Sequence, residues 1–259
     1  MCYEAAQLAF RIYKDAKRLG ASSEELETLK NKWEILKGEH VGMFHGHGFQ
    51  HPKLALFDLH NNELNIELGR WGLVPHWVKD TEQAKQIRSK TLNARGESIF
   101  EKPSFRDAAK KGRCLIPLDG FFEHHHKNGR TFPYFIQRKD RESLLVGGLK
   151  SSWLDPIKEQ VMCTATIVTT PGNELLSRIH NNPRLEGPRM PLVLESEDAE
   201  QWIKGSEKEA RELLKPNITQ QLEAHPVRPL RGKDYIGNCK EVQDEYAYPE
   251  LNEAPTLFD

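Results

Sequence analysis

A cysteine stands at position 2, where removal of Met1 would make it the N-terminal residue. An N-terminal cysteine carries a primary amine and a thiol on adjacent carbons. An aldehyde forms an imine with the amine, and the thiol then adds to the imine and closes a five-membered thiazolidine. The ordinary pKa is about 7.7–8.0 for the α-amine and about 8.5 for the thiol, so reactive forms of both are accessible near neutral pH. Internal cysteines cannot react in this way because they lack the free amine; these are Cys114, Cys163 and Cys239.

Five short strings of chemically useful residues follow one another between residues 1 and 194. They are MC at 1–2, WGLVP at 71–75, NARGE at 93–97, RCLIPLDGFFE at 113–123, and His180 followed by RMP at 189–191. Each string alone is a weak signal, but the five in this order resemble the SRAP family. That family is named for "SOS response-associated peptidase" and is known for crosslinking to DNA at abasic sites.

The resemblance implies catalytic or DNA-binding roles for eight residues. Glu123 would move protons as the sugar opens and the carbinolamine dehydrates, and His180 would shuttle a proton to the ring oxygen. Asn93 would hold the α-amine through an uncharged hydrogen bond. The implied catalytic residues are therefore Cys2, Asn93, Glu123 and His180, and the implied DNA-binding residues are Trp71, Arg95, Arg106 and Arg189.

The sequence departs from the family pattern in three places. The family usually begins Cys-Gly-Arg, whereas Tyr3 and Glu4 follow Cys2 here, which removes a basic contact next to the nucleophile. The family's His directly precedes Arg-Met-Pro, but residues 181–188 intervene after His180. The family's Glu-Trp pair becomes Glu123-His124, which leaves the acid intact.

The resemblance predicts covalent capture of abasic sites in single-stranded DNA through a Cys2 thiazolidine, which shields the lesion during the DNA damage response. It implies neither a cofactor nor a metal. A thiol peptidase, in which Cys2, His180 and Asn93 form a triad, is one alternative. A non-catalytic module that binds single-stranded or modified DNA is the other, and it predicts salt-sensitive binding without a covalent product.

Several residues also have simpler interpretations. Trp71 is equally compatible with a core aromatic, and Arg106 with the solvated face of a short helix. Three histidines follow Glu123, but adjacent residues on a strand point to opposite faces and cannot all converge on one ion. We therefore expect a solvated loop near a hairpin turn at residues 127–129 rather than a metal site.

The elements that must position these residues are predicted from hydrophobic periodicity. Residues 4–19 and 22–38 carry apolar side chains at helical spacing, which predicts a helical hairpin over 4–38. Short β-like runs and helices then alternate with Gly, Pro and Asn. We expect an α+β fold with a curled, barrel-like, mostly antiparallel sheet core and peripheral helices. The predicted strands are 53–59, 63–71, 113–118, 132–138, 144–149 and 161–169, and the predicted helices are about 104–111, 172–179, 196–204 and 206–214.

The composition describes a soluble chain of balanced charge. Of its 259 residues, 37% are hydrophobic and 29% are charged, and the formal net charge is −1. Any DNA contact must therefore come from a local basic surface. No run approaches the ~18–20 apolar residues of a membrane span, and no signal-peptide pattern begins the chain. We expect a cytoplasmic monomer with one domain over 1–230 and a loosely attached tail over 231–259.

Overall fold

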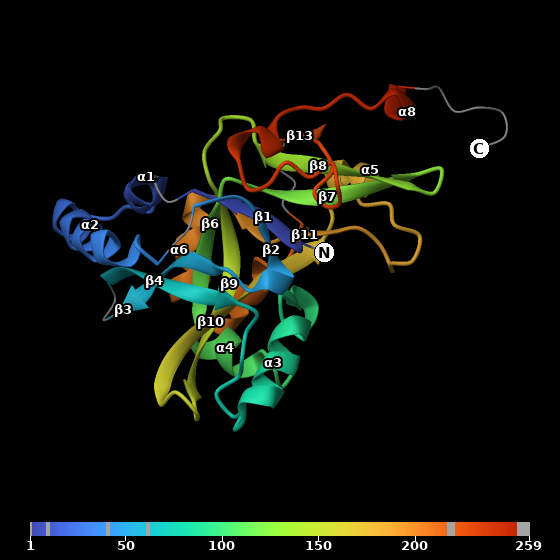
Figure 1. The fold of residues 1–259 in the computed structure, drawn as a ribbon. Helices are drawn as coiled ribbons and strands as arrows, with labels where there is room; N and C mark the ends of the chain where they lie inside the picture. Colours follow the sequence, from blue (N-terminus) through green and yellow to red (C-terminus); the bar gives the residue numbers. More distant parts are fainter. Residues whose placement is uncertain (1, 9–10, 40–41, 61–62, 217–220, 253–259) are drawn as a thin grey trace.

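The computed structural model describes residues 2–8, 11–39, 42–60, 63–216 and 221–252 (Figure 1). At its centre is an eight-stranded sheet in which β10, β4, β3, β6 and β9 pair in turn and β9 pairs back onto β10. These five strands form a closed barrel, and most of its pairings are antiparallel, as predicted. The strands of this sheet are β3 (Lys53–His60), β4 (Glu63–Trp71), β5 (Asn93–Arg95), β6 (Arg113–Leu118), β9 (Leu144–Asp155), β10 (Gln160–Pro171), β11 (Arg189–Pro191) and β12 (Val193–Leu194).

A second, five-stranded antiparallel sheet lies beside the barrel. Its order is β13 (Leu222–Pro226), β8 (Arg130–Arg138), β7 (Gly120–Lys127), β1 (Glu4–Gln7) and β2 (Met43–His47). The chain passes from β6 into β7 with only Asp119 between them. Gly120 makes this passage possible, because a Cβ there would lie 2.4 Å from the Phe135 ring and 2.6 Å from the Ile136 carbonyl oxygen. The second sheet thus extends directly from the barrel wall.

Most of the helices cover the outside of the barrel and its ends, whereas α5 and α8 lie beside the second sheet. They are α1 (Ile12–Arg18), α2 (Ser23–Leu36), α3 (Thr81–Lys90), α4 (Arg106–Lys111), α5 (Glu174–Ile179), α6 (Ser196–Lys204), α7 (Glu207–Glu212) and α8 (Pro249–Asn252), with short 3₁₀ turns η2 (Gly48–Gln50), η3 (Gly96–Ser98) and η4 (Lys240–Gln243). The strands predicted at 63–71 and 113–118 and the helix predicted at 196–204 have the observed bounds. The other predicted strands and helices are present with shifted ends.

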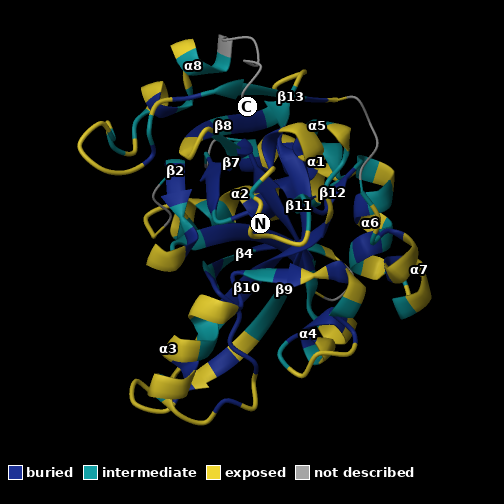
Figure 2. Ribbon diagram, turned by 90° about the vertical axis from the view of Figure 1, so that its right-hand side faces the viewer, coloured by how far each residue is buried: buried dark blue, intermediate teal, exposed yellow. Residues whose placement is uncertain are grey.

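Alternate residues of the barrel strands pack into two separate clusters. Phe57 of β3 packs with Trp202 of α6 in the first cluster, which contains many helix residues. Leu56, its neighbour, packs in the second cluster, which includes Cys2. Successive residues on a strand point to opposite faces, and both faces of β6 are buried, so its residues 114–118 are continuously apolar. Figure 2 shows the buried residues gathered in the strands and exposed ones on helices such as α3 and α7.

The prediction of a helical hairpin from residue 4 is wrong for its first segment. Glu4–Gln7 forms β1, which pairs with β2 on one side and β7 on the other, and α1 begins only at Ile12. The apolar spacing of residues 4–19 fits a helix locally, but the pairing with two distant strands overrides that preference. The second helix does begin near the predicted N-terminus, where Ser22 and Glu25 form a capping box.

The segment after residue 230 packs onto the second sheet, so the expectation of loose attachment is wrong for residues 231–252. The Asn238 side-chain oxygen accepts hydrogen bonds from the Phe44 and His45 amides at 2.8 and 3.0 Å. The Tyr248 hydroxyl donates to the Val227 carbonyl at 2.8 Å. Among the described residues, none of the helices is both long and apolar enough to cross a membrane.

Candidate functional site

Cys2 lies at the junction of the barrel and the second sheet. Its side chain is fully buried, and the residues after it form β1, in which Glu4 pairs with Phe122 of β7. Continuing this antiparallel register places residue 3 opposite Glu123. Asn93 approaches from β5, and its side-chain amide donates a 2.7 Å hydrogen bond to the Cys2 carbonyl. The hydrogen bond from Asn93 and the pairing of Glu4 with Phe122 therefore fix the main chain at Cys2 beside β7.

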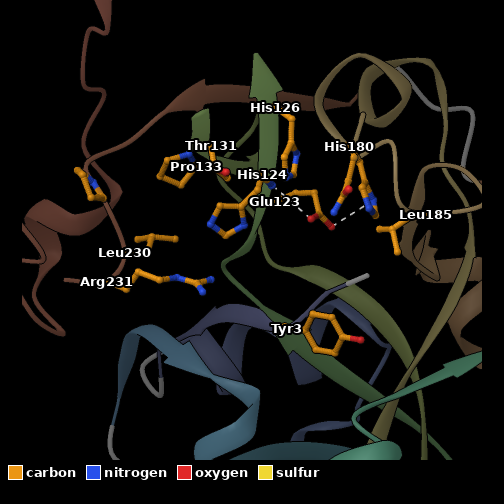
Figure 3. A pocket seen from close by; sticks show the side chains of 12 residues that line it. Tyr3, Glu123, His124, His126, Thr131, Pro133, His180, Leu185, Leu230 and Arg231 are labelled. Atoms are coloured by element: carbon orange, nitrogen blue, oxygen red, sulfur yellow. Dashed lines mark hydrogen bonds and ion pairs between the residues drawn. The ribbon is translucent and has the colours of Figure 1, made fainter. Parts of the chain in front are cut away.

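Glu123 and His180 form a buried pair in front of this junction. The Glu123 Oε2 lies 3.4 Å from the His180 Nδ1, and His180 ends α5 (Figure 3). The Arg189 amide donates to the same Nδ1 at 3.2 Å, which orients the ring. Burial lowers the pKa of His180, although the Glu123 carboxylate opposes this shift. His180 is therefore mostly neutral at pH 7 and can accept a proton.

The thiol of Cys2 is held in its protonated form. Burial raises its pKa far above the ordinary value, and the negative charge of Glu123 raises it further. Reactive thiolates in proteins instead sit beside positive charge or a helix N-terminus. The environment of Cys2 thus favours a reaction that starts from the neutral thiol.

An open pocket of about 420 Å³ is lined by Glu123 and His180 but not by the buried Cys2. Its lining includes Tyr3 below and Glu123, His124 and His180 above, with Leu185 on one side and Arg231 on the other (Figure 3). Four of the lining residues were singled out by sequence, Glu123 and His180 for chemistry and Tyr3 and His124 as departures from the family pattern. Arg231 carried no sequence signal.

Arg95 and Arg189 lie together at a neighbouring pocket of about 580 Å³. Arg95 is half-exposed and pairs with Glu186 at 3.0 Å. Arg189 is mostly buried, and its two terminal nitrogens contact the Glu97 carboxylate at 2.7 and 2.8 Å. One of them also donates to the Thr169 carbonyl at 2.7 Å. Both arginines thus flank the site, and each faces a glutamate.

Trp71 is not at the surface, so the prediction that it stacks on DNA is wrong for this structure. Its side chain is fully buried, and its indole N–H donates to the Leu92 carbonyl at 2.8 Å. It forms the wall beneath Gly48, where a Cβ would lie 3.4 Å from the indole. The structure therefore supports the alternative interpretation of Trp71 as a core aromatic.

Arg106 lies away from the other predicted DNA-binding residues. It begins α4, which lies at the opposite end of the barrel from β7 and α5 in both views (Figures 1 and 2). Its exposed guanidinium is 3.9 Å from the Asp107 carboxylate. The structure thus does not bring Arg106 to the pocket beside Cys2, and it fits the solvated face of a short helix.

The histidines after Glu123 do not form a loop, which corrects that expectation. They continue β7, and the hairpin turn follows at Asn128 and Gly129, both with positive φ. His124 Nδ1 lies 3.7 Å from the buried Glu4 carboxylate, and His45 and His47 approach the same carboxylate at 3.5 and 3.8 Å. No three of the described His, Cys, Asp or Glu side chains are arranged to hold a metal ion.

Comparison with known proteins gives a consistent result. The sequence model of the family described as SOS response associated peptidase (SRAP) matches residues 1–233. The abasic site processing protein YoqW of Bacillus subtilis is 32% identical over 209 residues, which cover 76% of this chain and 88% of that protein. The abasic site processing protein HMCES of Gallus gallus is 31% identical over 181 residues, which cover 61% of this chain and 51% of that protein.

A crystal structure from Bacteroides thetaiotaomicron has a similar fold. It superposes with a TM-score of 0.79 at 31% identity and covers 95% of this chain and 100% of that one. A second structure, from Bordetella bronchiseptica, gives a TM-score of 0.67 at 20% identity, over 87% of this chain and 99% of that one, and so supports the fold alone.

Proposed function

The chain belongs to the SOS response associated peptidase (SRAP) family, and we propose that it captures abasic sites in single-stranded DNA covalently through Cys2. Its curated relatives carry the name abasic site processing protein. Removal of Met1 exposes the amine and thiol of Cys2, and these react with the aldehyde of the ring-opened abasic sugar. The product is a thiazolidine that shields the lesion.

The contact between Asn93 and Cys2 carries this proposal. The Asn93 amide nitrogen holds the Cys2 carbonyl, while its oxygen is buried and has no hydrogen-bond partner among the described residues. A buried acceptor without a donor is costly and calls for an explanation. The α-amine of Cys2 belongs to the residue that Asn93 already holds and is a suitable donor. Such a hydrogen bond would orient the amine without fixing it as ammonium.

Glu123 and His180 supply the proton transfers. The amine adds to the aldehyde carbon and forms a carbinolamine, which loses water to give an imine. The thiol sulfur then bonds to the imine carbon, and its proton passes by way of Glu123 to the ring nitrogen. The net reaction joins aldehyde and aminothiol with loss of one water. A neutral His180 next to Glu123 suits proton transfer to and from the sugar oxygen.

The peptidase alternative receives less support from this geometry. A cysteine peptidase attacks through a thiolate, which a neighbouring positive charge must stabilise. Burial and Glu123 both raise the pKa of the Cys2 thiol instead. An imine that forms first on the amine does not need a thiolate, so an aldehyde trap fits this environment better.

A single strand is the substrate that the open pocket favours. Extruding a nucleotide from a duplex costs a few kcal/mol, whereas a single strand can bend to deliver the aldehyde. Arg95 and Arg189 each already face a glutamate, so they provide little surplus charge to offset that cost. Crosslinking time courses on matched single-stranded and duplex oligonucleotides at fixed salt test this, and equal rates would contradict it.

The central test is incubation of the mature protein with an abasic oligonucleotide, followed by a denaturing gel and intact mass measurement. We expect an adduct with the summed mass minus one water, which Cys2→Ala abolishes. Cys2→Ser should form an imine that borohydride traps but no stable ring, and Cys163→Ala is the matched control. A variant that retains Met1 should be inactive, and its robust crosslinking would show that the amine is not required. Binding without any covalent product would favour the binding-module alternative.

A further inference from the structure

A second pocket of about 360 Å³, rich in aromatic side chains, is lined by the two residues that follow Cys2, Tyr3 and Glu4. Tyr3, His47, Phe49, His124 and Arg231 line it, together with the carboxylates of Glu4 and Glu123. Phe49 is 51% exposed, so its ring is accessible to a ligand in this pocket. The mechanism proposed above uses none of the rings of Tyr3, His47 and Phe49.

The aromatic side chains form one continuous surface. The Phe49 ring centroid lies 5.4 Å from that of Tyr3, with a 31° angle between the planes, and 5.6 Å from that of His47, with a 36° angle. Offset and tilted rings at these distances attract each other, so they hold one another in place. We call Tyr3, His47 and Phe49 the aromatic platform.

The platform is fixed to the residue that follows the nucleophile. Phe49 belongs to η2, and the amide of the preceding Gly48 donates a 2.7 Å hydrogen bond to the Tyr3 carbonyl. Gly48 packs so closely that a Cβ there would lie 3.3 Å from that carbonyl oxygen and 3.4 Å from Trp71. Phe49 is therefore exposed on a rigid support, and not on a mobile loop tip.

A cation stands at the rim of the same pocket. Arg231 is 74% exposed, and its terminal nitrogen lies 3.8 Å from the buried Glu4 carboxylate. Burial by itself raises the pKa of Glu4, but His45, His124 and Arg231 outweigh it and hold the pKa below its usual value. The ionised Glu4 thus draws Arg231 over the pocket and leaves most of the guanidinium accessible. Figure 3 shows Arg231 and Tyr3 facing the same space below Glu123 and His124.

We propose that this pocket binds the nucleotide next to the abasic site, with its base on the aromatic platform and its phosphate against Arg231. The inference rests on the proposed function, because it places that nucleotide beside an aldehyde at Cys2. The abasic nucleotide has no base to stack, so its neighbour provides the stacking surface. Every base has a π-face, and the subsite is therefore tolerant of sequence.

The experiment uses a single-stranded oligonucleotide with a tetrahydrofuran abasic analogue, which has no aldehyde and cannot crosslink. A 2-aminopurine on either side of the analogue reports stacking through quenching of its fluorescence. We expect quenching on one side only with the wild-type protein. Phe49→Ala should remove the quenching and weaken binding roughly tenfold, within the range for one base on one aromatic side chain. Tyr13→Ala, an exposed aromatic 46% accessible on α1, is the matched control.

The contribution of Arg231 is measured by the salt dependence of binding. Arg231→Gln should lower the slope of log affinity against log salt by about one. Arg228→Gln is its control, because the guanidinium of Arg228 stacks on Tyr246 at 4.7 Å and does not line the pocket. Thermal melting of each variant verifies that the exposed substitutions leave the fold intact.

The outcomes separate this inference from the proposed function. Quenching without crosslinking of a true abasic oligonucleotide would reject only the covalent function. Crosslinking with no quenching on either side would overturn the subsite. Unchanged affinity and quenching in Phe49→Ala, or an equal loss in Tyr13→Ala, would overturn it as well.

Discussion

The two flanks of the reactive pocket are built differently. On one flank, Arg95 and Arg189 face Glu186 and Glu97, and both arginines are held by carboxylates. On the other flank, the aromatic platform offers stacking, and Arg231 keeps most of its guanidinium exposed. Exposed ion pairs are worth only about 0–1 kcal/mol, so a phosphate can displace a glutamate such as Glu186 at low cost. We infer that the first flank binds a phosphate only by displacing a glutamate, whereas the second offers both an accessible cation and a stacking surface.

The largest effect is expected at the centre, where the flanks meet. Glu123→Gln should slow crosslinking by about 10²–10⁴-fold, because it removes the group that moves the protons. Affinity for the tetrahydrofuran analogue should not fall, because glutamine keeps the size of the Glu123 side chain in the pocket lining and removes only a negative charge. Single-turnover rates and binding curves measured on one preparation test both statements. A parallel loss of rate and affinity would make Glu123 a structural acid.

The next largest effect is a difference in stability between variants of the buried Trp71 and the exposed Phe49. Trp71→Ala should lower the free energy of unfolding by about 3–5 kcal/mol, because it opens a cavity beneath Gly48. Phe49→Ala should change it by no more than about 0.5 kcal/mol, because the ring is exposed. Urea denaturation of both variants measures the difference. Similar unfolding free energies would mean that Phe49 supports the fold and is not poised for a ligand.

Arg95 and Arg189, on the first flank, should differ in how far each contributes to stability and to DNA binding. Arg189→Ala should cost about 1–2 kcal/mol of stability, because it leaves the Glu97 carboxylate and the Thr169 carbonyl without their donor. Arg95→Ala should leave stability unchanged and lower the salt slope of binding by about one. Denaturation and salt titration of each variant separate the two roles. Equal stability losses would contradict the division between a mostly buried and an exposed arginine.

The smallest effect concerns Glu186. Glu186→Gln should strengthen binding of single-stranded DNA a few-fold at low salt, because it releases Arg95 for a phosphate. The gain should fade at high ionic strength, where the interaction is screened. Glu174→Gln removes an exposed partner of Arg178 on α5 and is the matched control. Weaker binding by Glu186→Gln would mean that the glutamate itself contacts the ligand.

Local patterns in the sequence were sufficient where neighbours along the chain decide the structure. The strands at 63–71 and 113–118 and the helix at 196–204 could be predicted because their apolar runs and flanking turn residues are local signals. Cys2 could be proposed as the nucleophile because the aminothiol chemistry depends only on its place next to Met1. The family was identified from short strings whose order does not depend on their positions in space.

Tertiary structure alone decided which side chains can be reached. Residues 4–7 form a strand because β2 and β7 lie on either side of them, and a periodicity within one segment does not register distant partners. Trp71 and Phe49 are both aromatic residues beside glycines in the sequence, yet one is buried and the other is exposed. Arg231 reaches the pocket only because the C-terminal segment packs onto the second sheet. Exposure depends on what covers a residue, and the contacts that hold the C-terminal segment join Asn238 to Phe44 and His45, more than 190 positions away along the chain.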